Sequence, residues 1–314
     1  MFKWIIKRLL MMIPVLLGVI FVVFFIMNLT PTDAAEVILG SEGTEEEKEA
    51  LRDELGLNEP LLVQYVNYVG NLLKGDMGTS YRSGYDIREQ IFEKLPNTIL
   101  LASSAVLIAI IIGVPAGIIS AKKQYSVFDH VVTFIALIFA ATPGFWLGLV
   151  CVLFFAVKLG WLPAAGMGST FPALLTSLIL PAFTVSSNTM AMITRQTRSS
   201  MLEVISQDYI DTARSKGVSE KVVTVRHMLK NALIPIVTVI GLQFGVLLGG
   251  SVITENVFAW PGLGKYVVDS ITNRDTPAVL GCVVVIAVLF SLVNLLVDLL
   301  YGFIDPRIKS QFSR

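Results

Sequence analysis

Residues 208–217 place acidic, hydroxyl and basic side chains within a few helical turns, between two long apolar segments. The sequence there is Asp-Tyr-Ile-Asp-Thr-Ala-Arg-Ser-Lys-Gly, and a basic stretch continues to Lys230. These groups can form ion pairs and hydrogen bonds, but no nucleophile and base stand together among them. The pattern therefore favours docking of a partner over bond-breaking chemistry.

Helix start and stop signals divide this stretch into two arms. Asp208 is placed to cap a helix with Asp211 at its N3 position, and Gly217 supplies the left-handed residue that ends it. Ser219 is placed to cap a second helix. We expect its inward side to be apolar, lined by Val222, Val225, Leu229 and Ala232. Residues 208–230, here called the elbow, would give a partner a rigid lever; an ordinary capped surface loop is the alternative.

No catalytic or metal site is predicted. His130 and His227 have no Cys, His or carboxylate neighbours at ligand spacing, and Cys151 and Cys282 fall in apolar segments. The nearest approach to a phosphate-binding loop, Gly262-Leu-Gly-Lys-Tyr266, lacks both the first glycine and the final Ser or Thr. We expect no ATPase site, cofactor or nucleic-acid patch in this chain.

Composition assigns the chain to the lipid bilayer. Hydrophobic residues make up 54% of the 314 residues and charged residues only 15%, against about 25% in a soluble domain. A membrane-crossing helix takes about 20 apolar residues. Six segments are long enough, at residues 9–32, 95–121, 130–157, 171–194, 232–254 and 276–300. We predict an all-α integral membrane protein with six transmembrane helices, the first segment being too long for a secretory signal.

Charge placement predicts the orientation. Most of the 24 Lys and Arg residues lie in the two terminal segments, 1–8 and 301–314, near residue 122, or in the loop 195–231. Residues 33–94 carry more acidic than basic side chains, and the outer loop 255–275 is short. The positive-inside rule then places both termini and the loop 195–231 in the cytoplasm.

Residues 33–94 are predicted to form a small extracytoplasmic helical domain. Thr44 and Glu47 make a capping box, and Gly56 ends the short acidic helix that follows. Asp86 is placed to cap a last helix that leads into the second span. Between them, one helical face gathers Leu61, Leu62, Tyr65, Val66, Val69, Leu72 and Leu73, opposite Gln64, Asn67, Asn71 and Lys74. This apolar face packs within its own domain or lies in the membrane interface.

Polar groups in the spans are few. Thr184, Ser187 and Asn188 could line an aqueous path, or could satisfy neighbouring backbone groups. Glu255 and Asp298, near span ends, are expected to be paired or hydrated. Glycines four residues apart, at 113 and 117, 144 and 148, and 241, 245 and 249, predict close helix packing within the chain.

Several separated stretches together resemble one known family. Thr212-Ala-Arg-Ser-Lys-Gly217 resembles the cytoplasmic EAA loop of permease subunits in binding-protein-dependent ABC importers. This chain has Asp211-Thr-Ala213 where the general pattern begins Glu-Ala-Ala. That departure makes it most similar to the dipeptide, oligopeptide and nickel branch. Further matching stretches are Arg226-His227, Asn231-Ala-Leu-Ile-Pro235, Pro143-Gly-Phe-Trp146, Lys158-Leu-Gly-Trp-Leu-Pro163, Glu255-Asn-Val-Phe-Ala-Trp-Pro-Gly-Leu-Gly264, Arg274-Asp-Thr-Pro277, Leu55-Gly-Leu57 and Gly75-Asp-Met-Gly-Thr-Ser-Tyr81.

The resemblance implies a division of labour in a prokaryotic cytoplasmic membrane. This permease and a second permease subunit, expected to be a paralogue, would form the translocation path. Two ATP-binding cassette subunits, which would hold ATP and magnesium, would dock on the cytoplasmic loops, and an external substrate-binding protein would deliver the substrate. The residues expected to couple to the ATPase are Asp211, Thr212, Ala213, Arg214, Lys216, Gly217 and Arg226.

Peptides are the substrates that the resemblance implies, with nickel chelates or oligosaccharides as the alternative within the same importer type. A secondary transporter is the alternative of another class, but the sequence shows none of the internal duplication expected there. A membrane-embedded enzyme would need a convergent polar constellation, which the sequence lacks.

Overall fold

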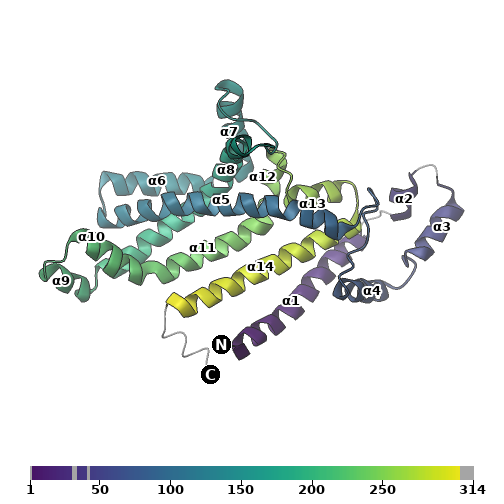
Figure 1. Cartoon of the computed structure of the whole chain (residues 1–314), viewed down its shortest axis with the longest axis horizontal. Coiled ribbons are helices and arrows are strands. Elements are labelled where there is room, and N and C mark those ends of the chain that lie inside the picture. Colours follow the sequence, from purple (N-terminus) through teal and green to yellow (C-terminus); the bar gives the residue numbers. More distant parts are fainter. Residues whose placement is uncertain (1, 30–33, 41–42, 305–314) are drawn as a thin grey trace.

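The computed structural model describes residues 2–29, 34–40 and 43–304, and this part of the chain is built from helices (Figure 1). Its elements before the centre of the sequence are α1 (Phe2–Leu29), α2 (Ala34–Leu39), α3 (Glu45–Glu54), α4 (Leu61–Leu73), α5 (Ile87–Lys122), α6 (Val127–Ala141), α7 (Gly144–Cys151) and the π-helix η2 (Val152–Lys158). Those after it are α8 (Phe171–Ile205), α9 (Asp208–Ser215), α10 (Glu220–Val222), the π-helix η3 (Val223–Leu229), α11 (Lys230–Gly250), α12 (Val252–Val257), α13 (Leu263–Thr272) and α14 (Thr276–Ile304).

Five helical stretches of the described chain are long and apolar enough to cross a membrane, and a bent pair makes a sixth if it counts as one span. The five are Ile5–Leu29, Ile87–Lys122, Phe171–Ile205, Glu220–Gly249 and Thr276–Leu299, and the pair is Val127–Ala141 with Gly144–Lys158. The predicted all-α membrane fold is confirmed.

The third span, predicted at residues 130–157, bends at Pro143, a residue type that bends or begins helices. Its two halves meet at an angle of 104°. Proline disfavours helical backbone in the residue before it, and Thr142, which precedes Pro143, is extended at ψ 124°. Pro143 then becomes the N-cap of α7. The second half therefore turns away from the bundle, at the top of Figure 1.

Two membrane helices extend beyond the apolar segments predicted for them. α5 begins at Ile87, because Asp86 caps it by accepting a hydrogen bond from Glu89 N at 3.2 Å, and it continues through Pro96 without a break. α8 begins at Phe171 as expected but continues past residue 194 to Ile205. The predicted loop 195–231 thus opens with about three turns of helix.

Close backbone contacts hold the centre of the bundle together. A Cβ added to Gly117 of α5 would lie 2.6 Å from the carbonyl oxygen of Thr194 on α8. A Cβ on Gly241 of α11 would overlap Val297 of α14. Both glycine stripes therefore pack within the chain, as predicted. Gly144 is an exception, since a Cβ there would meet nothing within 4 Å.

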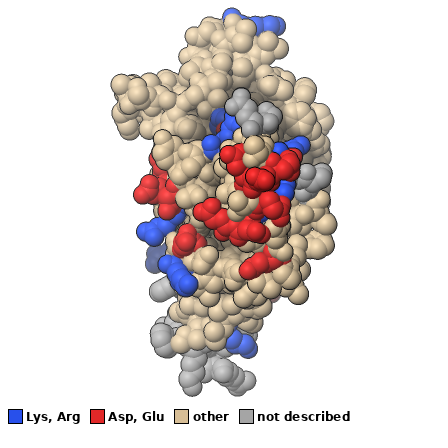
Figure 2. All heavy atoms as spheres, turned by 90° about the vertical axis from the view of Figure 1, so that its right-hand side faces the viewer, with Lys and Arg blue, Asp and Glu red and all other residues tan. Residues whose placement is uncertain are grey.

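The elbow and the helices α2–α4 lie at opposite ends of the bundle (Figure 1). Asp and Glu side chains gather on the end with α2–α4 (Figure 2), which we call the acidic end. The capping box that opens α3 forms as predicted: Thr44 N donates to Glu47 Oε2 at 2.9 Å, and Glu47 N donates to Thr44 Oγ1 at 3.2 Å. The backbone and side-chain hydrogen bonds of Thr44 hold the pKa of Glu47 below its usual value.

Candidate coupling elbow and transport path

The elbow turns at Gly217, as predicted. Gly217 has φ +78°, in the left-handed region that favours glycine. Its N–H donates to the carbonyl of Arg214 at 2.9 Å, and the N–H of Val218 donates to the carbonyl of Ala213 at 3.3 Å, which together form a Schellman motif. Val218 and Ala213 also pack in the same apolar cluster. The angle between the two arms is therefore fixed.

The predicted cap of the first arm is wrong by one residue, whereas that of the second arm is at the predicted position. α9 begins at Asp208 itself, with Gln207 as its N-cap and no side-chain capping bond. Ser219 is the N-cap of α10, but its hydroxyl makes no capping bond. Asp208 and Asp211 both lie in the first turn of α9, where the positive end of the helix dipole stabilises their negative charge.

Apolar residues on the inner side of both arms fix the elbow to the bundle. They come from the elbow itself and from the ends of α5, α8 and α11 that meet it. The buried members are Ala121, Met201, Ile210, Ala213, Val223, Met228, Ala232 and Ile236. The elbow is thus packed as one piece with three membrane helices.

The inward face of the second arm differs from the predicted one. Val222 and Val225 are exposed at 41% and 57%, whereas Val223 between them is fully buried. Residues 223–229 form a π-helix, whose hydrogen bonds span five residues instead of four and shift the side that faces inward. Of the residues predicted to face inward, Leu229 and Ala232 do so.

The outer surface of the elbow carries most of the residues predicted to dock a partner. Ala213 is the exception, because it belongs to the buried cluster. The exposed ones are Asp211, Thr212, Arg214, Lys216, Gly217 and Arg226. Tyr209 is exposed beside them at 43%. With Val222 and Val225, it gives this polar surface an apolar component of the kind found in protein interfaces.

Arg214 joins the two arms across the turn. Its Nε donates to Glu220 Oε1 at 2.8 Å and its Nη1 donates to Asp211 Oδ1 at 3.2 Å. The hydrogen bond with Glu220 raises the pKa of Arg214 above its ordinary value. Lys122, at the end of α5, donates to Thr224 Oγ1 at 2.9 Å and lies 3.7 Å from Glu220 Oε2. Polar as well as apolar contacts therefore tie the elbow to α5.

A second polar cluster, which the sequence analysis missed, lies beside the elbow. Asp129 of α6 is 3% exposed, and Arg198 of α8 donates to its two oxygens at 2.7 and 2.8 Å. The Ser120 hydroxyl of α5 and the Tyr125 N–H also donate to this carboxylate. Bidentate Arg–carboxylate pairs are geometrically specific. This one joins three membrane helices near the elbow.

The polar residues predicted along the fourth span do not share one environment. Thr184 and Ser187 are buried, and the Ser187 hydroxyl donates to the carbonyl of Thr184 at 2.8 Å. Asn188 is exposed. Residues four, seven and eleven positions further on share its helix face. These are Met192, Arg195 and Ser199, and all three are also exposed. Asn188 is thus the one of the three predicted residues that reaches an open surface of α8.

Comparison with known proteins covers nearly the whole chain. Residues 113–310 match the family described as "Binding-protein-dependent transport system inner membrane component", and residues 1–102 match its N-terminal region. The dipeptide transport system permease protein DppB of Alkalihalophilus pseudofirmus is 45% identical, over 98% of this chain and 100% of that protein. The chain belongs to this family.

Other relatives of the permease carry related names. The oligopeptide transport system permease protein AppB of Bacillus subtilis is 42% identical over 98% of this chain and 100% of its own. The glutathione transport system permease protein GsiC of Escherichia coli O6:H1 is 40% identical over 98% and 99%. Among solved structures, the inward-facing MetNI methionine ABC transporter shares the fold, with a TM-score of 0.55 and 18% identity over 68% of this chain and 96% of that one.

At the acidic end of the permease, residues 255–264 fold around the Glu255 carboxylate. Glu255 is fully buried; its Oε1 accepts from Thr98 Oγ1 at 2.9 Å and from Ser251 Oγ at 2.7 Å, and its Oε2 accepts from Lys265 N at 3.0 Å. A Cβ on Gly262 would overlap this carboxylate. The pairing expected for Glu255 is therefore with hydroxyl and amide donors.

Two carboxylates near opposite ends of α14, Asp298 and Asp275, are each paired with another part of the chain. Arg8 of α1 lies 2.9 Å from Asp298, which confirms the pairing expected there. Asp275 accepts from the Tyr81 N–H at 3.1 Å and from the Ser80 hydroxyl. This second contact joins two stretches that carried the family resemblance, 75–81 and 274–277, although they lie far apart in the sequence.

Proposed function

We propose that this permease translocates short peptides across the cytoplasmic membrane as one pore-forming subunit of an ATP-driven importer. The observation that carries the substrate class is the full-length identity of 45% with a dipeptide permease, together with the oligopeptide relative. Glutathione, which the third relative is named for, is itself a tripeptide. The expected substrates are peptides of a few residues.

ATP hydrolysis is assigned to partner subunits that hold ATP and magnesium. The elbow supports this division, because its turn is hydrogen-bonded, its inner side is packed on three spans and its outer side presents exposed polar residues. A push on such a surface moves the attached helices instead of bending a loop. The residues proposed to receive it are Asp211, Thr212, Arg214, Lys216, Gly217 and Arg226, with Ala213 supporting them from beneath.

The acidic end would face outward and the elbow would face the cytoplasm. Acidic side chains gather at one end (Figure 2), whereas Lys122, Arg198 and the basic residues of the elbow lie at the other. Positive charge on the cytoplasmic side is the general rule. An external binding protein would then meet the acidic end, and a second permease subunit would complete the path along the exposed Asn188 face of α8.

The direct experiment is peptide uptake by cells that depend on this permease and its partner subunits. Uptake of a labelled dipeptide should stop when ATP is depleted and continue when the proton gradient is collapsed. The opposite pattern would identify a secondary transporter. If the cells took up a nickel chelate or an oligosaccharide but no peptide, the importer function would stand and the proposed substrate class would be refuted.

A further inference from the structure

The helix α4 has three chemically different sides. Successive residues of an α-helix are about 100° apart, so residues three and four apart share a side. One side carries Leu61, Tyr65, Tyr68 and Leu72. The second carries Gln64, Asn67 and Asn71, and the third carries Leu62, Val66, Val69 and Leu73. No charged residue occurs within the helix.

The tyrosine side packs on the first membrane span. The Tyr65 ring meets the edges of Phe21 and Phe24, with ring centroids 5.2 and 5.8 Å apart, and Tyr68 lies 6.1 Å from Phe24. Tyr65 Oη donates to the carbonyl of Leu17 at 2.9 Å. Leu17 lies well inside the candidate span Ile5–Leu29. This contact places α4 beside the apolar span, not beyond its end.

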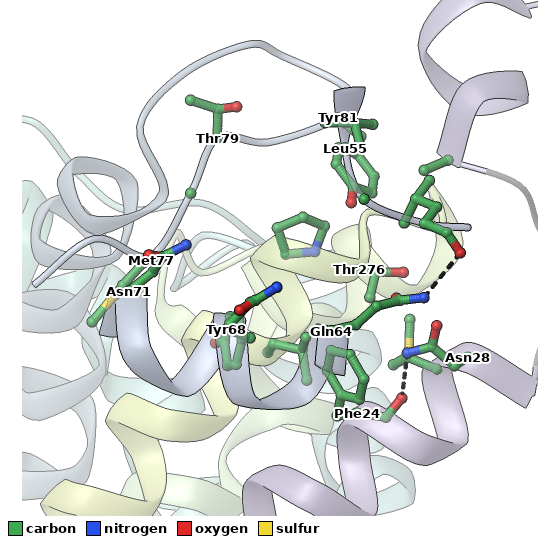
Figure 3. Close-up of a pocket in the computed structure, with 18 of the residues that line it drawn as sticks. Phe24, Asn28, Leu55, Gln64, Tyr68, Asn71, Met77, Thr79, Tyr81 and Thr276 are labelled. Atoms are coloured by element: carbon green, nitrogen blue, oxygen red, sulfur yellow. Dashed lines mark hydrogen bonds between the residues drawn. The ribbon is translucent and has the colours of Figure 1, made fainter. Parts of the chain in front are cut away.

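The amide side faces a pocket of about 480 Å³ that is lined by both polar and apolar residues (Figure 3). Gln64, Asn67 and Asn71 line it from α4, and Glu59 and Asp76 line it from the loops at either end of that helix. Tyr81 and Thr276 contribute from other parts of the chain. The polar groups of α4 therefore face an open space and not the packed bundle.

The third side is apolar and uncovered. Leu62 and Val66 are each 64% exposed and Leu73 is 83% exposed, and no residue of α4 is buried. Leaving such a side chain in water forgoes the favourable free energy of burying it. The exposed faces of Phe21 and Phe25 on α1, at 36% and 43%, lie next to the Tyr65 contact. The uncovered side of α4 thus continues the apolar surface of a membrane span.

We propose that α4 is an interfacial membrane helix whose Leu62–Val66–Leu73 side lies among the acyl chains of the outer leaflet. A helix with an apolar side opposite a polar side is the kind of segment that lies at the boundary between headgroups and acyl chains. The amide side of α4 stays with the pocket water. The neighbouring α3 carries six acidic residues among its ten and has no buried residue, so it lies on the aqueous side. The bilayer would then hold the acidic end against α1, independently of what the permease transports.

Fluorescence quenching by lipid tests this placement. Single cysteines at Val66 and Leu73 would carry a polarity-sensitive fluorophore in the assembled transporter, reconstituted in vesicles of phosphatidylcholine and phosphatidylglycerol. With acyl chains brominated near the headgroup, emission from both labels should fall several-fold, and aqueous iodide should quench them little. Cys151 and Cys282 are buried in the native chain, so the unsubstituted protein gives the labelling background.

Asn67→Cys is the matched control, because Asn67 neighbours Val66 in sequence but lies on the pocket side. Its label should be quenched by iodide and little by brominated lipid. Equal responses at Asn67 and Val66 would overturn the proposal. A Val66 label shielded from both quenchers would mean that a protein subunit covers this side, which also refutes lipid contact. Agreement between Val66 and Leu73 guards against a local effect of one substitution.

Discussion

Arg198 donates from Nε and Nη2 to the two carboxylate oxygens of Asp129, at 2.7 and 2.8 Å, and so clamps α8 to α6 beside the elbow. Asp129→Ala should destabilise the permease by about 3 kcal/mol, because it removes one partner of a buried ion pair. This value is at the low end of the range for such variants, since the Arg198 side chain is 27% exposed and keeps some contact with solvent. The measurement is the apparent melting temperature of the purified protein.

An exposed ion pair provides the control for that variant. Glu45 lies 3.1 Å from Lys48 on α3, and its side chain is 81% exposed. Glu45→Gln should change stability by no more than about 0.5 kcal/mol. Equal melting temperatures for Asp129→Ala and Glu45→Gln would show that the buried clamp is not holding the helices.

Close packing of α5 on α8 predicts that Gly117 tolerates no side chain. Gly117→Ala places a Cβ 2.6 Å from the carbonyl oxygen of Thr194, so the helices must separate, at a cost of about 1–3 kcal/mol. Gly18→Ala in α1 meets nothing within 4 Å and should be neutral or slightly stabilising. Thermal unfolding of both variants checks the contrast, and a stable Gly117→Ala protein would contradict the described packing.

Asn188 should be accessible to water-soluble reagents, whereas Ser187 should not. Asn188 is exposed on α8, and Ser187 is buried with its hydroxyl bound to the backbone. In the assembled importer, a charged thiol reagent should modify Asn188→Cys many-fold faster than Ser187→Cys, and bound peptide should slow the reaction at Asn188. Similar rates at both positions would remove this face of α8 from the proposed path.

Glu255 is expected to organise the loop at the acidic end. Its Oε2 accepts from Lys265 N, and Oε1 accepts from two hydroxyls. In Glu255→Gln, the amide N–H₂ would face one of these donors. The donor then loses its hydrogen-bond acceptor, which lowers the stability of the folded protein by about 1–3 kcal/mol. Tryptic cleavage after Lys265 should accelerate. Asp269→Asn, which breaks a half-buried pair with the side chain of the same lysine at 2.6 Å, should leave the backbone protected; equal cleavage in both variants would contradict this role.

Much of the fold follows from apolar segment length and local signals. The spans, the start of α8 at Phe171, the capping box at Thr44 and the turn at Gly217 were all predicted, because each depends on residues within a few positions of one another. The bend at Pro143 also has a local cause, because the residue before a proline favours extended backbone, and Thr142 is extended. The length of the apolar run does not set the angle of this bend.

The positions that were not predicted depend on other features. Asp129 and Arg198 are 69 residues apart, and no local pattern pairs them. The exposed position of Val225 follows from the π-helix at residues 223–229, which an α-helical pattern does not anticipate. Burial of Thr184 depends on the neighbouring α7, since Gly148 packs against it. Contacts between spans, not periodicity, decided these positions.

Coupling through the elbow is tested most directly at Gly217, in vesicles that contain the complete transporter. A Cβ at Gly217 meets nothing within 4 Å in this chain, but φ +78° excludes a β-branched residue without rearranging the turn. Asn adopts this conformation more readily and serves as the control. We expect Gly217→Val to retain ATP hydrolysis and lose peptide uptake, and Gly217→Asn to retain both. Unimpaired uptake by assembled Gly217→Val, or ATP hydrolysis by the permease chain alone, would contradict the account.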